Sequence, residues 1–139
     1  MKNGACVVFD ANPKLFCDYN VLPPENFKFI MKEIHADNAG INTEGFIHIK
    51  GCEKLDTIVL TNCTYIEDDT LDKLILRKDS LKVLKINKCK NITDEGLKVL
   101  GSLTNLEKIV ISDLPYLKNP EKVQEDLKLK LPNCNIDIN

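Results

Sequence analysis

Six cysteines and two histidines are the residues with the most obvious capacity for chemistry in this chain of 139 residues. The cysteines are Cys6, Cys17, Cys52, Cys63, Cys89 and Cys134. Cysteine and histidine at short, regular spacings hold zinc, and paired cysteines form redox centres or disulfide frameworks. No two of these cysteines form a C-x-x-C pair, and His35 and His48 stand in no ligand-like spacing. The spacing therefore predicts neither a zinc site nor a disulfide scaffold.

Acid–base catalysis is the other chemistry to consider, because Asp68 and Asp94 recur at the same place in two similar segments. Each precedes an expected helix, where a carboxylate commonly caps the helix N-terminus. The chain contains no glycine-rich phosphate loop, no G-x-S-x-G and no H-E-x-x-H. His35 lies in an expected strand, where an exposed surface position is the simpler interpretation. We therefore predict that the chain is not an enzyme.

The elements that carry these residues recur along the chain. Residues 55–68 read L-x-x-I-x-L-x-x-C-x-x-I-x-D, and residues 81–94 read L-x-x-L-x-I-x-x-C-x-x-I-x-D. A third copy begins at Leu106 and has Leu114 in place of the cysteine. Self-similarity at a period of about 25 residues is typical of leucine-rich repeats, here of the cysteine-containing type.

Each repeat predicts a short strand followed by a helical part. Residues 83–87 alternate apolar and polar types, which sends Leu84 and Ile86 inward. An earlier, degenerate repeat starts near residue 31, and the final repeat has a longer helix from Pro120 and an edge strand within 131–138. We predict an α/β fold, a short leucine-rich-repeat solenoid of about four strand–helix coils with a parallel sheet on the concave face. Residues 28–139 form this domain, and residues 1–27 form a small irregular N-terminal cap.

The repeat position also assigns a role to two cysteines. Cys63 and Cys89 occupy the same repeat position, which points into the core, where a free cysteine acts as a small hydrophobe. We expect both to be structural core residues. From their placement we expect the thiols of all six cysteines to be buried and reduced, in the cytosol, nucleus or mitochondrial matrix.

The concave face is the candidate site for a partner, because a solenoid presents side chains there at regular spacing. The expected contact residues are Thr57, Thr61, Asn62, Lys85, Asn87, Lys88, Lys108, Ser112 and Asp113. The alternative is a sheet face that is merely solvated.

Composition excludes several classes of protein. The chain is 43% hydrophobic, which is ordinary for a globular domain, and its formal net charge of -2 argues against a nucleic-acid binder. No apolar run approaches the roughly 18 residues that a membrane-spanning helix needs. We expect a monomer that is soluble or peripheral to a membrane.

Four blocks of sequence resemble a known family. They are residues 18–23 (D-Y-N-V-L-P), 28–36, 63–68 and 111–115. Their order and spacing are similar to the mitochondrial ATP synthase subunit s family, also called coupling factor B, from about Gly4 to the C-terminus. The distal membrane arm assembly protein of respiratory complex I shares much of this plan. The motif residues are Asp18, Tyr19, Asn20, Leu22 and Pro23.

The resemblance implies a non-catalytic protein on the matrix side of the mitochondrial inner membrane. It would associate with ATP synthase and support proton conduction or coupling, or alternatively help to assemble the membrane arm of complex I. A third alternative is a substrate-recognition module of an F-box-type ubiquitin ligase, which shares the repeat type but would need an F-box segment. A stability fragment without function is a further alternative.

Two departures from the family bear on these expectations. Members carry a presequence and further helices ahead of the segment that matches residues 4–9, whereas three residues precede it here. We therefore expect a truncated form, a fragment or a relative without an import signal. The family's N-terminal part is associated with magnesium, but Pro24 follows the Leu22–Pro23 pair and has no side-chain oxygen, so we predict no metal or other cofactor.

Overall fold

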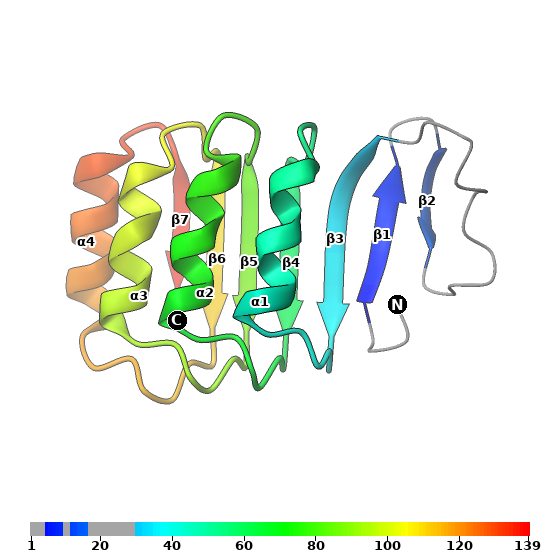
Figure 1. Ribbon diagram of the computed structural model, residues 1–139. Helices are drawn as coiled ribbons and strands as arrows, with labels where there is room; N and C mark the ends of the chain where they lie inside the picture. The colour runs from blue at the N-terminus through cyan, green and yellow to red at the C-terminus, as the bar shows by residue number, and fades with distance from the viewer. Residues whose placement is uncertain (1–4, 10–11, 17–29) are drawn as a thin grey trace.

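A computed structural model describes residues 5–9, 12–16 and 30–139 of the chain. These residues form an α/β structure in which all helices lie on a single side of one sheet (Figure 1). The strand order in the sheet is β2-β1-β3-β4-β5-β6-β7. The strands are β1 (Ala5–Phe9), β2 (Asn12–Phe16), β3 (Met31–Asp37), β4 (Thr57–Thr61), β5 (Val83–Asn87), β6 (Lys108–Ser112) and β7 (Asn135–Ile138).

A helix follows each of the strands β3 to β6. Three of these helices are α-helical for one turn and continue as a 3-10 helix, while α4 is a longer α-helix of 11 residues. None of the helices in the described ranges has the length and apolarity needed to cross a membrane. The helices are α1 (Thr43–Phe46), η2 (Ile47–Gly51), α2 (Asp68–Asp72), η3 (Lys73–Arg77), α3 (Asp94–Lys98), η4 (Val99–Ser102) and α4 (Pro120–Lys130).

The strands β3 to β7 run parallel, and their pairing keeps the sequence repeat in register. Ile58 of β4 pairs with Leu84 of β5, which pairs with Ile109 of β6. Strand β1 joins the other side of β3 in the antiparallel direction, and β2 pairs antiparallel with β1. The predicted strands at residues 6–9 and 83–87 and the predicted edge strand within 131–138 are confirmed. The loop predicted at residues 20–25 lies outside the described residues.

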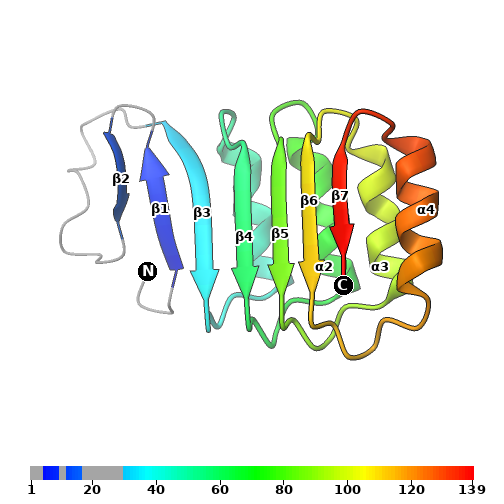
Figure 2. The same ribbon diagram turned by 180° about the vertical axis from the view of Figure 1, so that it is seen from behind.

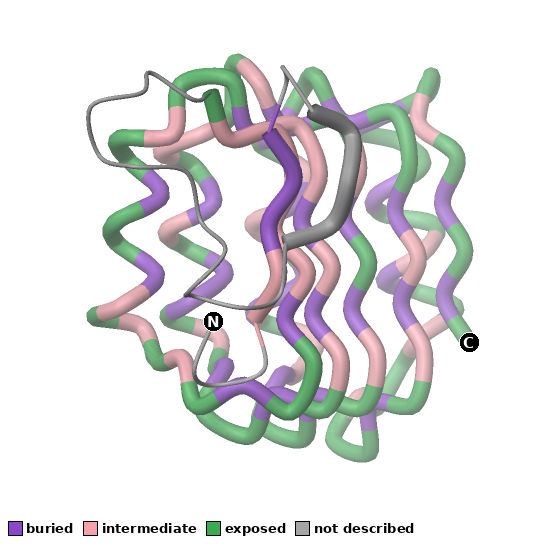
Figure 3. The backbone as a smooth tube through the Cα atoms, turned by 90° about the vertical axis from the view of Figure 1, so that its right-hand side faces the viewer, coloured by how far each residue is buried: buried purple, intermediate pink, exposed green. Residues whose placement is uncertain are grey.

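The hydrophobic core lies between the sheet and the helices. Along β4 and β5, Ile58, Leu60, Leu84 and Ile86 are at most 1% exposed and alternate with partly exposed or exposed residues. This alternation along the strands is visible in Figure 3. Each such side chain contributes about 1.5–3 kcal/mol of hydrophobic stabilisation relative to an exposed position. Each strand–helix unit packs on its neighbours, so stacking of units, rather than helix propensity, stabilises the short helices.

The last unit ends the sheet. The predicted longer helix from Pro120 is confirmed, with the proline in the first turn, where a missing backbone N–H costs little. Its apolar side chains Val123 and Leu127 are buried against the core. Strand β7 then forms the sheet edge and places Asn135 and Asp137 on its exposed face, which discourages pairing with a further strand.

Candidate functional site

The face of the sheet opposite the helices is the candidate site, and we call it the open face. In Figure 2 it turns toward the viewer, and no helix of the described residues crosses it. Alternation along the parallel strands sends every second side chain to this face, and the strand register aligns these side chains in rows. One row is Glu33, Thr57, Val83, Lys108 and Asn135, the next is His35, Val59, Lys85, Val110 and Asp137, and the third is Asp37, Thr61, Asn87 and Ser112.

Six of the nine expected contact residues lie on strands and face this way. Lys85 and Lys108 are exposed, and Thr57, Thr61, Asn87 and Ser112 are partly exposed. The side-chain oxygen of Asn87 is buried and has no hydrogen-bond partner among the described residues. The structure therefore brings these six residues together as a mixed polar and basic surface.

The other three expected residues follow the strand ends in a row of turns. Asn62, Lys88 and Asp113, together with Asn38 of the first unit, have φ values of 50°, 57°, 54° and 52°. In the first three turns along the chain, the donors are the backbone N–H groups of Asn38, Asn62 and Lys88. Each donates to the carbonyl oxygen of the last residue of the next strand, and the distance from Asn62 N to Asn87 O is 2.8 Å. The left-handed backbone suits asparagine and aspartate but is strained for lysine. Lys88 is therefore the one residue of this row whose type disagrees with its backbone.

The N-terminal side of the open face is acidic. His35 Nε2 and Glu33 Oε2 are 2.7 Å apart, so the histidine that the sequence places on a strand is half-buried and paired with a carboxylate. Asp37 accepts from the Asn38 amide at 2.9 Å, and the Asn62 amide in turn donates to Asn38 Oδ1. These contacts tie the first unit to the second through polar side chains.

Cys63 and Cys89 are fully buried in the core and lie one above the other in successive units. The Cys63 thiol donates to Ala36 O at 3.5 Å and the Cys89 thiol to Leu60 O at 3.8 Å, each in the preceding unit. The neighbouring Cys63 thiol and burial raise the pKa of Cys89, so this thiol stays protonated and unreactive at neutral pH.

The expectation that the cysteines are all buried and reduced is wrong in part. Cys52 and Cys134 are free thiols but only partly buried, and burial raises the pKa of both. Cys6 is disulfide-bonded. An aligned repeat position predicts burial only for the cysteines that occupy it, and these three lie outside that position.

The prediction that Asp68 and Asp94 cap their own helices is also wrong. The residue before each of them is the N-cap: Glu67 forms a capping box with Thr70, and the Thr93 hydroxyl accepts from Glu95 N at 3.3 Å. The carboxylates of the two aspartates instead reach the next unit.

Asp68 and Asp94 link successive units through charge-assisted hydrogen bonds. Asp68 accepts from the backbone N–H of Thr93 at 2.8 Å and from its hydroxyl at 2.6 Å. Asp94 accepts from the backbone N–H groups of Lys118 and Asn119 at 2.7 and 3.0 Å, which fixes the start of α4. These aspartates therefore link successive units of the structure.

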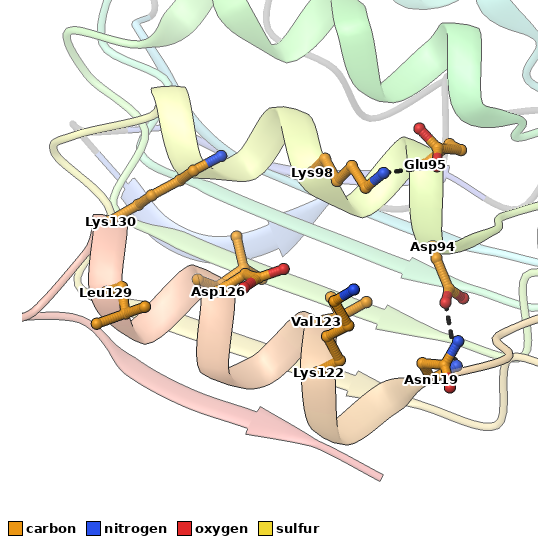
Figure 4. Close-up of a pocket in the computed structure, with 10 residues that line it drawn as sticks. Asp94, Glu95, Lys98, Asn119, Lys122, Val123, Asp126, Leu129 and Lys130 are labelled. Carbon is orange, nitrogen blue, oxygen red and sulfur yellow. Dashed lines mark hydrogen bonds and ion pairs between the residues drawn. The ribbon is translucent and has the colours of Figure 1, made fainter.

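The helix side carries a cavity of about 540 Å³ between α3 and α4. Figure 4 shows positively and negatively charged side chains around the cavity. Lys98 Nζ donates to Glu95 Oε1 at 2.6 Å, and the Asp94 carboxylate accepts from the backbone N–H of Asn119 at the start of α4. Val123, Leu127 and the exposed Leu129 supply apolar surface. This lining contains no histidine, cysteine or serine.

Within the described part of the chain, no three or more His, Cys, Asp or Glu side chains are grouped so that they could hold a metal ion. The motif residues Asp18 to Pro23 and Pro24 lie outside the described residues.

Comparison with known proteins assigns the family. No family model matches the chain. The protein named ATP synthase subunit s, mitochondrial, of Mus musculus is 35% identical over an aligned length of 144 residues. The alignment covers 100% of this chain and 72% of that protein. The proteins of the same name from Bos taurus and Homo sapiens are 33% identical over 143 and 142 residues, which span 99% of this chain and 71% of each relative. The chain belongs to the mitochondrial ATP synthase subunit s family. The predicted family resemblance is thereby confirmed.

In this member of the subunit s family, the acids at both ends of the open face are not among the contact residues predicted from the sequence. Glu33 and Asp37 lie on β3, and Asp137 lies on β7. The first and last units depart from the repeat frame, so their outward positions could not be aligned with those of the central units. The alternation within residues 31–37 and 135–138 was the signal that could have placed them.

Proposed function

We propose that this chain is a non-catalytic accessory subunit of mitochondrial ATP synthase, bound peripherally to the inner-membrane complex from the matrix side. The observation that carries the proposal is the 35% identity over the whole chain to a protein named as a subunit of that enzyme. We further propose that it supports proton conduction or coupling. It would do so by contact with other subunits, since the described residues contain no constellation that meets the requirements of an active site.

We infer that the repeating units form a leucine-rich-repeat solenoid of about four coils, with the open face as its concave surface. The in-register pairing of β3 to β6 and the placement of the helices on one face support this inference. Residues 28–139 form the repeat domain in this proposal, and residues 1–27 form the N-terminal cap. The domain acts as a monomer.

The open face is the proposed contact surface with the complex. Solenoids bind partners through such rows, because each unit adds a side chain at a fixed interval. The proposed contacts are Thr57, Thr61, Asn62, Lys85, Asn87, Lys88, Lys108, Ser112 and Asp113. The alternative of a solvated face predicts that substitutions there leave association unchanged.

Fractionation of cells that express the tagged chain tests the proposal. Mitochondria are isolated, solubilised in mild detergent and separated on a density gradient, and the chain is followed together with subunits of ATP synthase and of complex I. We expect the chain in the mitochondrial fraction, in the same gradient fractions as ATP synthase. Extraction from intact inner membranes by alkaline carbonate, without detergent, would agree with peripheral binding.

Two other outcomes would refute the proposal. Co-migration with complex I, and not with ATP synthase, would favour an assembly role for the membrane arm. Recovery only in the cytosol with ubiquitin-ligase components would favour a substrate-recognition module. A chain expressed with a heterologous mitochondrial presequence serves as the control for import.

A further inference from the structure

We propose that the open face binds an acidic segment of a protein partner, with two carboxylates on one side of the segment and apolar side chains beside them. The proposal rests on the proposed function, because it specifies the chemistry of the partner at the same surface. It is carried by the arrangement of charge and apolar surface in the middle of the sheet.

Two lysines and three valines alternate at the centre of this face, and we call these five residues the central patch. Lys85 of β5 lies between Val59 of β4 and Val110 of β6 in one row. Lys108 of β6 lies beside Val83 of β5 in the adjacent row. Both lysines are exposed and the three valines are partly exposed. A partner that covers the patch thus buries apolar surface and meets two positive charges.

The charges of the central patch are available to a partner. Among the described residues, neither Lys85 nor Lys108 takes part in an ion pair. Other lysines form ion pairs: Lys32 Nζ lies 3.2 Å from Asp56 Oδ2, and Lys98 Nζ lies 2.6 Å from Glu95 Oε1. A carboxylate that approaches the central patch therefore gains two attractive interactions and displaces no existing one.

Acidic side chains on both sides confine the partner to the middle of the face. Glu33 and Asp37 lie on β3 to one side, and Asp137 lies on β7 to the other. A basic segment would be repelled at the centre. A broad anionic surface such as a membrane would be repelled at both ends. A narrow acidic segment satisfies the centre without reaching the ends.

The spacing of the two lysines suits a short regular segment. Strands lie about 4.8 Å apart and alternate residues of one strand about 6.7 Å apart, so the two lysine Cα atoms are about 8 Å apart along the diagonal. Carboxylates at i and i+4 of a helix have Cβ atoms about 5–6 Å apart. The flexible lysine side chains bridge the difference. An amphipathic helix with two acids one turn apart fits the central patch.

The first test uses purified, detergent-solubilised ATP synthase and a carbodiimide, which joins amines to carboxylates without a spacer. Mass spectrometry of the product should identify Lys85 or Lys108 joined to an aspartate or glutamate of a synthase subunit. Cross-links only from lysines of α4, such as Lys122 or Lys128, would overturn the proposal, even though binding itself would still support the proposed function.

The second test compares two charge-reversed variants that have the same net charge. Lys85→Glu/Lys108→Glu changes the central patch, and Lys122→Glu/Lys128→Glu changes two exposed residues on the helix side. The first should bind the synthase at least about tenfold more weakly, because attraction becomes repulsion at both positions, and the second should bind like the parent chain. Circular dichroism should show both to be folded. Equal affinity of the two variants would overturn the proposal.

If the chain does not bind the synthase at all, the proposed function is refuted. Peptide binding then tests the acidic-segment proposal separately. A labelled helical peptide with glutamates at i and i+4 among leucines should bind the parent chain and lose binding to the Lys85→Glu/Lys108→Glu variant. The same peptide with lysines in place of the glutamates should show the opposite preference. Absence of any peptide binding, or patch-dependent binding to cardiolipin-containing vesicles alone, would overturn the acidic-segment proposal.

Discussion

The contact between Asp68 and Gly96 offers the sharpest test of how successive units are joined. A Cβ atom built on Gly96 would lie 2.2 Å from Asp68 Oδ1, 2.7 Å from its Cγ and 3.0 Å from its Cβ. The substitution Gly96→Ala therefore cannot coexist with the present position of the Asp68 carboxylate. The carboxylate must rotate away, and it then loses its hydrogen bonds to the backbone N–H and hydroxyl of Thr93.

The magnitude follows from these two bonds. A hydrogen bond contributes about 0.5–1.5 kcal/mol, and about 1.5–3 kcal/mol when one partner is charged. Because Asp68 is partly exposed, each of its two bonds is assigned about 1–1.5 kcal/mol, so the loss is about 2–3 kcal/mol for the pair. Replacement of glycine by alanine in a helix returns up to about 1 kcal/mol. Gly96→Ala should therefore lower the free energy of unfolding by about 1–2 kcal/mol.

A double-mutant cycle separates this mechanism from a general intolerance of alanine. In an Asp68→Ala background the carboxylate is gone, and only the 3.0 Å approach of the two Cβ atoms must relax by a few tenths of an ångström. Gly96→Ala should then change stability by less than about 0.5 kcal/mol, which gives a coupling energy of about 1–2 kcal/mol.

The equivalent glycine of the first unit supplies the control. A Cβ atom on Gly45 would lie 3.4 Å from Ile41 Cγ1 and 3.5 Å from Asn42 Oδ1, which are ordinary contacts, so Gly45→Ala should be neutral or slightly stabilising. Urea unfolding followed by circular dichroism is the suitable assay, because the chain has no tryptophan. An equal loss of stability from Gly96→Ala in both backgrounds would refute the proposed contact.

Three further predictions concern the turns, the thiols and the last helix. Lys88→Asn should raise the free energy of unfolding by about 0.5–1 kcal/mol, because asparagine tolerates the left-handed backbone at φ 57° better than lysine; urea unfolding checks this, and a loss of stability would contradict it. Burial raises the pKa of Cys134, so iodoacetamide should modify this thiol more slowly at pH 8 than a peptide thiol, and the buried Cys89 should react only on unfolding. The stability that the protonated Cys134 thiol contributes is complete below the ordinary thiol pKa and is lost as the pH rises through the raised value. Asp94→Ala should cost about 1–2 kcal/mol and expose the start of α4 to proteolysis, while Asp72→Ala, an exposed helix position, should not.

The central repeats could be predicted from the sequence in detail. The alternation within residues 83–87 gave both the bounds of β5 and the inward direction of Leu84 and Ile86. The proline at residue 120 marked the start of the last helix. These features depend on the local backbone, since a strand or helix fixes where each of its own side chains points.

Contacts between units could not be predicted in the same way. A carboxylate at the start of a helix satisfies the same sequence pattern whether it caps that helix or binds the next unit. For Asp68 and Asp94 the second arrangement holds, because the stacking of units brings a backbone N–H group 24 or 25 residues away within reach. The disulfide at Cys6 and the pairing of His35 with Glu33 likewise depend on distance in space.

The sequence alone determined the repeating alternation, the buried cysteines at the aligned position and the family to which the chain belongs. Only the tertiary structure decided which side chains of different units meet, and hence that two lysines stand among valines between acidic ends of the open face. The physical reason is that periodicity orients a side chain relative to its own strand, whereas its neighbours across the sheet are set by strand register and stacking.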